Sequence, residues 1–396
     1  MDTNNLDFKT HYFDWAATSP ADSDILENAL KESLAVWGNP SSIHAAGTEA
    51  KDFLNKARNK AAAALNVKAE NLYFTSGGTE SDHIPLLAML NRPAKGTILI
   101  SSIEHPALRE QAAALKNLGW NIVSIPANEN GIITPEAVES CYTSDTVLVC
   151  VMAVNNETGA IQPIYKIADK ITELSGGKRR AKFHVDCVQA AGKIPLNLNY
   201  KGIDSAAFSA HKICGPRGIG ILYCNYVITP FLRGGGQENN IRSGTENLFG
   251  AKAFADCLER YFISEKNPAM QTRFEQQKQF TGNFIEKLLT LKNCSIIPHS
   301  RETSENEENF SPWVIQAAFK NIPGQVMVRA LSSKGFFIST GSACSAKKQS
   351  RPILEAMHVT AEESETAVRF SFGAHTTEQA MNELFEEVAK ICADFC

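Results

Sequence analysis

Lys212 lies in the segment 208–220, between a Ser/His pair and a turn rich in glycine and proline. Upstream, the short apolar segment 181–186 ends in the carboxylate of Asp186. A lysine amine can form a Schiff base with the aldehyde of pyridoxal phosphate, and a carboxylate can pair with the pyridinium nitrogen so that the ring accepts electrons. The two residues together predict a pyridoxal phosphate site. On its own, Lys212 is more simply explained as a surface lysine on a glycine-rich loop.

A second segment predicts a binding site for a phosphate group. Residues 71–75 form a predicted strand, and Ser76-Gly77-Gly78-Thr79-Glu80 leads from it into a predicted helix. Glycines allow close approach of the backbone, and the free N–H groups at the start of a helix bind anions. A Gly-Gly turn before a helix is often only a turn, so this motif alone is weak evidence for a phosphate site.

The elements that position these residues alternate between strands and helices. Predicted strands occupy residues 97–101, 121–125, 146–152, 182–186, 204–209 and 220–224. This alternation predicts an α/β fold with a mostly parallel sheet covered by helices, in which ligands bind beyond the carboxyl ends of the strands. The candidate residues that directly follow predicted strand ends are Gly78, Thr79, His105, Asn156, Asp186 and Lys212.

The length of 396 residues predicts two domains. The segment 250–291 is helical in period with a break near Asn267-Pro268, and beyond it lie predicted strands at 313–319 and 367–372. We expect residues 20–255 to form a large cofactor-binding domain. Residues 1–19 and 256–396 are expected to form a smaller α+β domain. In that smaller domain, the polar run 300–309 predicts a solvated loop, and Thr376-Thr377-Glu378-Gln379 predicts a capping box for the last helix.

Composition excludes several classes of function. With 43% hydrophobic residues, 21% charged residues and a net charge of −4, the chain is an ordinary globular protein without the basic surface that nucleic-acid binding requires. No apolar run is long enough to predict a membrane span, and the polar N-terminus does not read as a secretory signal. Ten cysteines without CxxC pairs or zinc-site spacing predict reduced thiols in the cytoplasm and no metal site.

Further motifs extend over nearly the whole chain in a fixed order. They include Gly38-Asn39-Pro40-Ser41-Ser42, Thr75-Ser76-Gly77-Gly78-Thr79-Glu80-Ser81, Asn155-Asn156-Glu157-Thr158-Gly159, His184-Val185-Asp186, Gly235-Gly236-Gln237-Glu238, Arg242-Ser243-Gly244-Thr245 and Ser342-Ala343-Cys344-Ser345. In these motifs the chain resembles the cysteine desulfurases of the NifS/IscS type. That family belongs to the class V aminotransferase group of fold-type I pyridoxal phosphate enzymes. Trp15, His83 and Pro85 depart from the usual family pattern.

The resemblance implies a role for each cofactor-binding residue. Lys212 is expected to carry pyridoxal phosphate as a Schiff base, Asp186 to hold the pyridinium nitrogen and Gln189 to bind the ring hydroxyl. His105 is expected to stack on the ring and transfer protons, although a lone histidine in this position is more often a core residue. The residues expected to bind the phosphate are Gly78, Thr79, Ser209 and His211.

The resemblance also implies residues for the substrate and for a second subunit. Asn156 and Arg369 are expected to hold the substrate carboxylate, although an arginine in a strand is otherwise usually just paired or exposed. Thr245 is similar to a threonine that reaches the phosphate of the neighbouring subunit, which implies a homodimer. Cys344 occupies the position of the family's persulfide-forming cysteine. Nearby Lys347 and Lys348 favour its thiolate, and the other nine cysteines are interpreted as structural.

The implied function is conversion of L-cysteine to L-alanine, with the sulfur captured as a persulfide on Cys344. The sulfur is expected to pass to an acceptor such as an iron–sulfur scaffold or a tRNA-thiolation protein. The nearest alternatives are a selenocysteine lyase or another enzyme of the class V aminotransferase type. A pyridoxal phosphate-binding regulator without turnover and a protein that delivers sulfur only in a complex are two further alternatives.

Overall fold

The computed structural model describes residues 10–341 and 351–395. The strands of the larger sheet are β1 (Leu72–Thr75), β2 (Thr97–Ser101), β3 (Asn121–Ile125), β4 (Thr146–Cys150), β5 (Lys182–Asp186), β6 (Ser205–Ser209) and β7 (Gly220–Cys224). Those of the smaller sheet are β8 (Cys294–Ile297), β9 (Val314–Phe319) and β10 (Ala367–Ser371). Among the described residues the principal helices are α1 (Ser23–Ala35), α2 (Ala45–Leu65), α3 (Gly78–Ala88), α4 (Pro106–Asn117), α5 (Pro135–Cys141), α6 (Ile164–Leu174), α7 (Leu248–Tyr261), α8 (Pro268–Leu289), α9 (Gly324–Ser333), α10 (Pro352–Ala356), α11 (Ala361–Thr366) and α12 (Glu378–Asp394).

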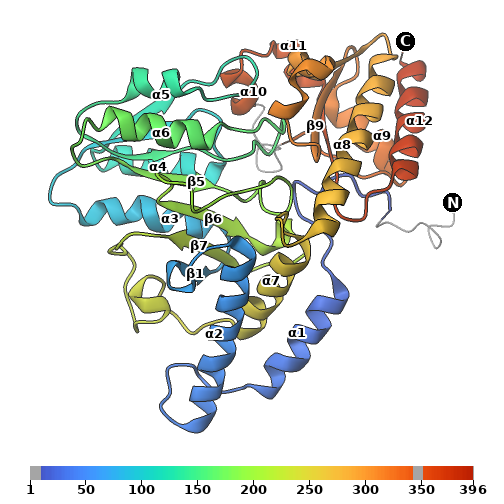
Figure 1. The fold of residues 1–396 in the computed structure, drawn as a ribbon. Helices are drawn as coiled ribbons and strands as arrows, with labels where there is room; N and C mark the ends of the chain where they lie inside the picture. Colours follow the sequence, from blue (N-terminus) through green and yellow to red (C-terminus); the bar gives the residue numbers. More distant parts are fainter. Residues whose placement is uncertain (1–9, 342–350, 396) are drawn as a thin grey trace.

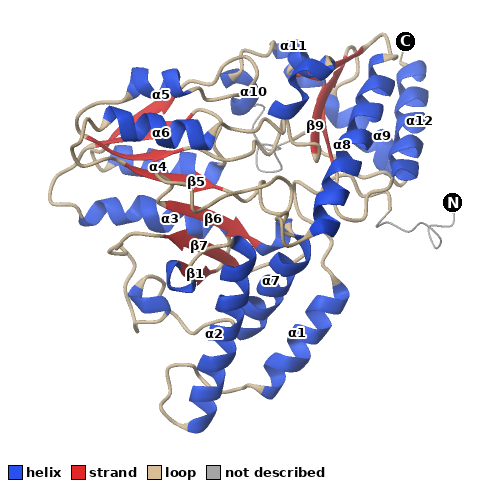
Figure 2. Ribbon diagram, viewed as in Figure 1, coloured by secondary structure: helices blue, strands red, loops and turns tan. Residues whose placement is uncertain are grey.

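The larger sheet has the strand order β1-β7-β6-β5-β4-β2-β3. Strands β2 to β6 pair in parallel, whereas β7 is antiparallel to both of its neighbours, β1 and β6. The predicted mostly parallel α/β sheet is therefore confirmed. Figure 2 shows its strands in red among the blue helices of the larger part of the molecule.

Helices cover both faces of this sheet because successive strand residues point to opposite sides. On one face, Ile98 and Ile100 of β2 pack with α3 and α4 in an apolar cluster. On the other face, Leu99 belongs to the main core, which also contains residues of α2, α6 and α7. Since apolar residues occupy both faces, the buried strands read in the sequence as continuous apolar runs.

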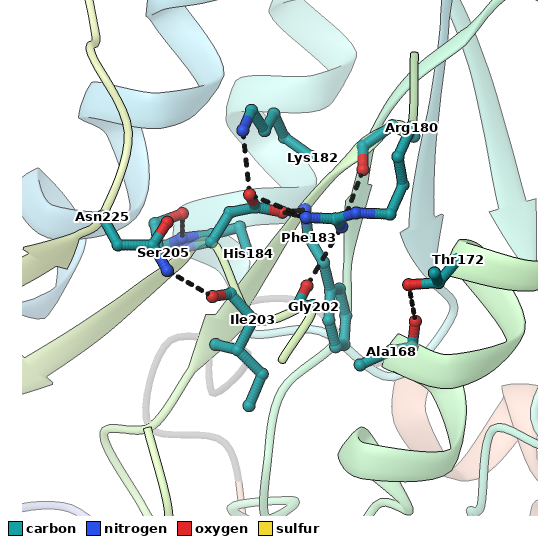
Figure 3. A network of polar contacts seen from close by, with 12 residues as sticks. Ala168, Thr172, Arg180, Lys182, Phe183, His184, Gly202, Ile203, Ser205 and Asn225 are labelled. Atoms are coloured by element: carbon teal, nitrogen blue, oxygen red, sulfur yellow. Dashed lines mark hydrogen bonds and ion pairs between the residues drawn. The ribbon is translucent and has the colours of Figure 1, made fainter. Parts of the chain in front are cut away.

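The register between β5 and β6 is fixed by polar side chains around Asp204. Its carboxylate accepts hydrogen bonds from Arg180, Lys182 and the backbone N–H of Phe183. Nearby, the His184 imidazole lies 2.8 Å from the hydroxyl of Ser205, directly across the two strands. Figure 3 shows this network seen from close by. It sets the pairing that places the last residues of β5 and β6 at the same edge of the sheet.

An ion pair with a buried carboxylate secures the edge strand β1. The Arg58 guanidinium donates to both carboxylate oxygens of Glu238, at 2.6 and 2.7 Å, and also to the carbonyl of Leu72. The same carboxylate accepts from the backbone N–H of Phe74 at 2.7 Å. The loop that contains the predicted Gly-Gly-Gln-Glu motif is therefore tied to the strand that leads into α3.

The smaller sheet has the order β10-β9-β8, with antiparallel pairing throughout. Figure 1 shows β9 with α8, α9 and α12 gathered at one end of the molecule, away from α1 and α2. The third strand, β8, lacks a clear period in the sequence and was not predicted. The expected domain limits, 20–255 for the large domain and 1–19 with 256–396 for the small one, remain a proposal.

Two local predictions in this part of the chain are wrong. The run 300–309 is not simply a solvated loop, because it forms short 3-10 helices in which Arg301 is buried and donates to the carbonyls of Thr158 and Ser311. The last helix is capped by Thr377, whose hydroxyl accepts from the N–H of Ala380. The N-cap therefore lies within the predicted segment 376–379, but the reciprocal bond of a capping box is missing because the residue three positions after Thr377 is Ala380.

Among residues 10–341 and 351–395, no helix combines the length and the apolar character needed to cross a bilayer. The cytoplasmic location remains a prediction from the sequence.

Candidate active site

A cavity of about 300 Å³ lies at the carboxyl ends of the parallel strands. The predicted site residues that line it are Gly78, Thr79, His105, Asn156, Asp186, Gln189, Ser209, His211, Lys212 and Arg369. Thr245 does not line the cavity of this chain and is exposed. Cys344 lies outside the described residues. The cavity is also lined by Gly341 and Pro352, on either side of the segment that contains Cys344.

Lys212 ends a short 3-10 turn that directly follows β6. Its Nζ donates hydrogen bonds to the carbonyl oxygens of Ala16 and Ala17, at 2.5 and 2.7 Å. The N-terminal segment is held to the lysine loop by a further bond, from the N–H of Ser19 to the carbonyl of His211. The amine therefore lies at a fixed position in the wall of the cavity.

The acid at the end of β5 is buried, and its surroundings favour the protonated form. Burial, and then the nearby carboxyl of Asp82, raise the pKa of Asp186 to about 8. Burial likewise raises the pKa of Glu104 to about 8 and that of Asp82 well above its usual range. Asp186 Oδ1 accepts a hydrogen bond from the N–H of Val188, which fixes its orientation. A cation in the cavity next to Asp186 would stabilise its ionised form.

His105 is the N-cap of α4 and lines the cavity. Its Nδ1 accepts a hydrogen bond from the N–H of Ala107 at 3.1 Å, so the neutral ring carries its proton on Nε2. Burial, followed by the charges of Lys212 and Arg109, lowers the pKa of His105 to about 4. The imidazole is therefore neutral at physiological pH and can donate a proton from Nε2 or accept one in exchange.

The predicted phosphate site combines the start of α3 with the end of β6. The backbone of Gly78 approaches Val188 so closely that an added Cβ would lie 2.7 Å from its Cγ2. Ser209 and His211 contribute the facing side chains, and the His211 Nδ1 lies 3.1 Å from the hydroxyl of Thr18. Among the described residues no side chain caps the start of α3, and a helix start of this kind beside a hydroxyl is a suitable site for a phosphate.

Gln189 is held by a buried lysine that the sequence did not single out. Lys193 Nζ donates to Gln189 Oε1 at 2.5 Å, and Gln189 Nε2 donates to the carbonyl of Ala16 at 2.8 Å. Because the lysine can only donate, it fixes the amide with its NH₂ group away from Lys193. Burial, and then the charge of Lys212, lower the pKa of Lys193 to about 7.

Arg369 reaches the cavity from the middle of β10 in the smaller sheet. It is 1% exposed, donates to the Asn156 carbonyl at 2.9 Å and pairs with Asp14 at 2.7 Å. Its buried Nε and the Asn156 Oδ1 have no hydrogen-bond partner among the described residues. A carboxylate in the cavity would provide an acceptor for this guanidinium.

Sequence reasoning missed three charged residues of the site, Asp14, Arg109 and Glu157. Arg109 follows His105 by one helical turn, so the spacing of four residues could have identified it. Glu157 lies next to the predicted Asn156 in the same motif, and Arg351 approaches it at 3.7 Å. No sequence signal marked Asp14, because its importance depends on the tertiary contact with Arg369.

The three departures from the family pattern lie outside the cavity lining. Trp15 packs its ring against Gly373, where an added Cβ would lie 2.0 Å from the indole. His83 Nε2 lies 3.0 Å from the carbonyl of Ala107, and Pro85 is buried inside α3. Trp15 and His83 are therefore adjacent to the site through Ala16 and α4 without lining the cavity.

The residues present fit pyridoxal phosphate. An amine, a buried acid and a helix start meet around one cavity whose volume matches that of small-ligand sites, about 300 Å³ or more. Asn156, Glu157 and Arg369 line the cavity, and each has a buried polar atom that finds no hydrogen-bond partner among the described residues. Within residues 10–341 and 351–395 no group of three or more His, Cys, Asp or Glu side chains is arranged to bind a metal ion.

Comparison with known proteins decides the family. The model of the aminotransferase class-V family matches residues 11–384. The chain belongs to this family. It is 33% identical to the cysteine desulfurase IscS of Dictyoglomus turgidum over 96% of this chain and 94% of that protein. It is 34% identical to the cysteine desulfurase IscS of Methanosarcina thermophila over 97% and 92%.

A solved structure supports the same family membership. A structure described as a NifS-like protein aligns with a TM-score of 0.86 and 32% identity, covering 97% of this chain and 99% of that one. The predicted resemblance to the NifS/IscS group and the predicted fold-type I architecture are therefore confirmed.

The buried Asp186 predicts a pH-dependent stability for the cofactor-free protein. The folded-state pKa of Asp186 is about 8, whereas an exposed Asp titrates near 3.9. Between these values the folded protein binds more protons than the unfolded chain, so stability falls as pH rises from about 4 to 8. We expect Asp186→Asn to become progressively more stable than the wild type over this range in urea denaturation.

The matched control for this experiment is Asp52→Asn, because Asp52 is exposed on α2. The free energy of unfolding of Asp52→Asn should have the same pH dependence as that of the wild type. Glu104 and Asp82 contribute to this pH dependence in every variant. Identical pH slopes for wild type and Asp186→Asn would show that Asp186 ionises normally in the folded protein.

Proposed function

We propose that this protein is a pyridoxal phosphate-dependent cysteine desulfurase that converts L-cysteine to L-alanine. The observation that carries the proposal is the meeting of Lys212, Asp186, His105 and Arg369 around one cavity. Relatives named cysteine desulfurase align over nearly the full chain, which favours this reaction over a selenocysteine lyase or an aminotransferase. When bound, pyridoxal phosphate supplies an electron sink for the bond that breaks at the substrate Cα.

The proposed roles of the cofactor-binding residues follow from their positions. Lys212 Nζ would hold the cofactor and, as an amine in the cavity wall, would accept the α-proton of the substrate. Asp186 would pair with the pyridine nitrogen, whose positive charge would compensate the burial that otherwise keeps this acid protonated. Gln189, oriented by Lys193, would donate through Nε2 to the ring hydroxyl. Gly78, Thr79, Ser209 and His211 would hold the phosphate.

The substrate is held and protonated by residues on opposite sides of the cavity. Arg369 binds the α-carboxylate with Asn156, and its pair with Asp14 fixes the plane of the guanidinium. Neutral His105 holds a proton on Nε2 that it can transfer during the reaction.

Sulfur transfer requires a thiolate, and we assign this role to Cys344. Its sulfur forms a bond with the substrate sulfur while the Cβ–S bond breaks, and the electron pair left on Cβ takes up a proton. The product on the protein is a persulfide, which passes to an acceptor such as an iron–sulfur scaffold or a tRNA-thiolation protein. Burial raises the pKa of the Cys214 thiol to about 12 and that of Cys187 well above its usual range. These two cysteines are therefore poor nucleophiles.

Replacement of the proposed nucleophile tests the function. Cys344→Ser should still bind pyridoxal phosphate and L-cysteine, seen as a change in cofactor absorbance, because neither step needs a thiol. Release of alanine should fall at least about 100-fold, since a hydroxyl is not ionised near neutral pH. Peptide mapping after a single turnover should place the persulfide of the wild type on Cys344.

Cys187→Ala and Cys214→Ala are the controls and should retain persulfide formation. Sulfane sulfur on either of these two residues would identify a different nucleophile. Formation of a 2-oxo acid in place of alanine would instead indicate an aminotransferase.

We further propose that the protein is a homodimer in which Thr245 of one subunit reaches the phosphate site of the other. Within one chain Thr245 is exposed and lies outside the cavity. Its segment is anchored by the ion pair between Arg242 and Glu80, at 3.2 Å, next to the start of α3. Exposed Trp37 and Ile43, 80% and 101% accessible, provide apolar surface that a second subunit can cover.

A mixed dimer tests the shared site. Lys212→Ala and Thr245→Ala chains should each be inactive or nearly so as homodimers. If Thr245 serves the opposite subunit, their heterodimer contains one intact site and one doubly damaged site. We expect roughly half of the wild-type alanine release per heterodimer. Heterodimers isolated with two affinity tags that show no recovered activity would place Thr245 in the site of its own chain.

A further inference from the structure

Arg109 places a second guanidinium in the substrate cavity. It lies on α4 four residues after His105, and both side chains line the same cavity because residues four apart share one face of a helix. The buried Nη1 of Arg109 has no hydrogen-bond partner among the described residues. A buried donor without a partner is unfavourable, so this nitrogen is suited to a ligand that enters the cavity.

The two arginines of the cavity differ in how their charge is balanced. Arg369 pairs with Asp14 at 2.7 Å and also donates to the Asn156 carbonyl. Arg109 forms no ion pair with a carboxylate of residues 10–341 or 351–395, although its charge is felt at His105, Glu104 and Glu157. The cavity therefore has one arginine that is already paired and one whose charge is not neutralised by a partner.

We propose that Arg109 is a specificity-determining residue that binds an anionic group on the β-carbon of the substrate amino acid. This inference rests on the proposed function, in which Arg369 takes the α-carboxylate. With that group bound, the side chain of the substrate is the remaining part that can carry negative charge. For L-cysteine the group is the sulfur as thiolate, and Arg109 favours the ionised form over the neutral thiol.

The test compares two ligands of nearly equal shape, L-aspartate and L-asparagine, which differ in the charge of the side chain. Their dissociation constants are measured from the cofactor absorbance of the holoenzyme, and L-alanine serves as a ligand without a side-chain polar group. The wild type should bind L-aspartate more tightly than L-asparagine. In Arg109→Gln this preference should fall about tenfold, the factor that one charge-assisted hydrogen bond contributes. The affinity for L-alanine should stay within about twofold of the wild type, because L-alanine carries no group for Arg109.

Two further variants separate recognition from general effects. Arg109→Lys keeps the charge and should retain part of the preference for L-aspartate. Arg92→Gln is the matched control, because Arg92 also has a buried nitrogen with no partner in the described part of the chain but lies outside the cavity. The preference of Arg92→Gln for L-aspartate over L-asparagine should equal that of the wild type. Thermal unfolding of each variant verifies that the fold is intact.

The outcomes are distinguishable. An unchanged preference in Arg109→Gln, or an equal loss of affinity for all three ligands, overturns the assignment of Arg109 while the proposed function stands. A wild-type holoenzyme whose cofactor absorbance responds to none of these amino acids or to L-cysteine overturns the proposed function, and this inference with it.

Discussion

The candidate site depends on the burial of Asp186 at the end of β5. Burial, and then the nearby carboxyl of Asp82, raise the pKa of Asp186 and favour its protonated form, and the pKa values of Asp82 and Glu104 are raised as well. A cationic pyridine ring next to Asp186 would reverse this balance and make ionisation favourable. The unfavourable burial of the acid is thus explained by the ligand that the cavity fits.

The second requirement is that distant parts of the chain meet at this cavity. The segment around Phe13 is bonded to the part of the chain that carries the smaller sheet, since its N–H donates to the carbonyl of Phe337 and its carbonyl accepts from the N–H of Ser371, the last residue of β10. Three residues later, Ala16 supplies a carbonyl to both Lys212 and Gln189. Arg369 of β10 pairs with Asp14 of the same N-terminal segment. The cofactor-anchoring side and the substrate-binding side are therefore coupled through one short N-terminal segment.

Much of the fold and of the candidate site could be predicted from local signals. The apolar runs at β4 and β5 and the residues that follow strand ends placed His105, Asn156, Asp186 and Lys212 at one edge of the sheet. Prediction from the sequence failed where local signals are weak or absent. Strand β8 has no clear hydrophobic period, and Arg301 is buried although it lies within a polar run. Asp14 acquires its partner, Arg369, only in the tertiary structure. Arg109 had a usable signal in its helical spacing from His105, but an arginine near the start of a helix usually faces solvent.

The central claim is that Lys212 is the residue to which pyridoxal phosphate is attached. Reduction of the holoenzyme with borohydride would convert the Schiff base to a stable secondary amine, which tryptic mapping then locates. The structure predicts the pyridoxyl group on Lys212 and none on Lys193, although burial lowers the pKa of Lys193 to about 7 and makes its amine the competing nucleophile. A pyridoxyl group on Lys193, or on any lysine other than Lys212, would contradict the account.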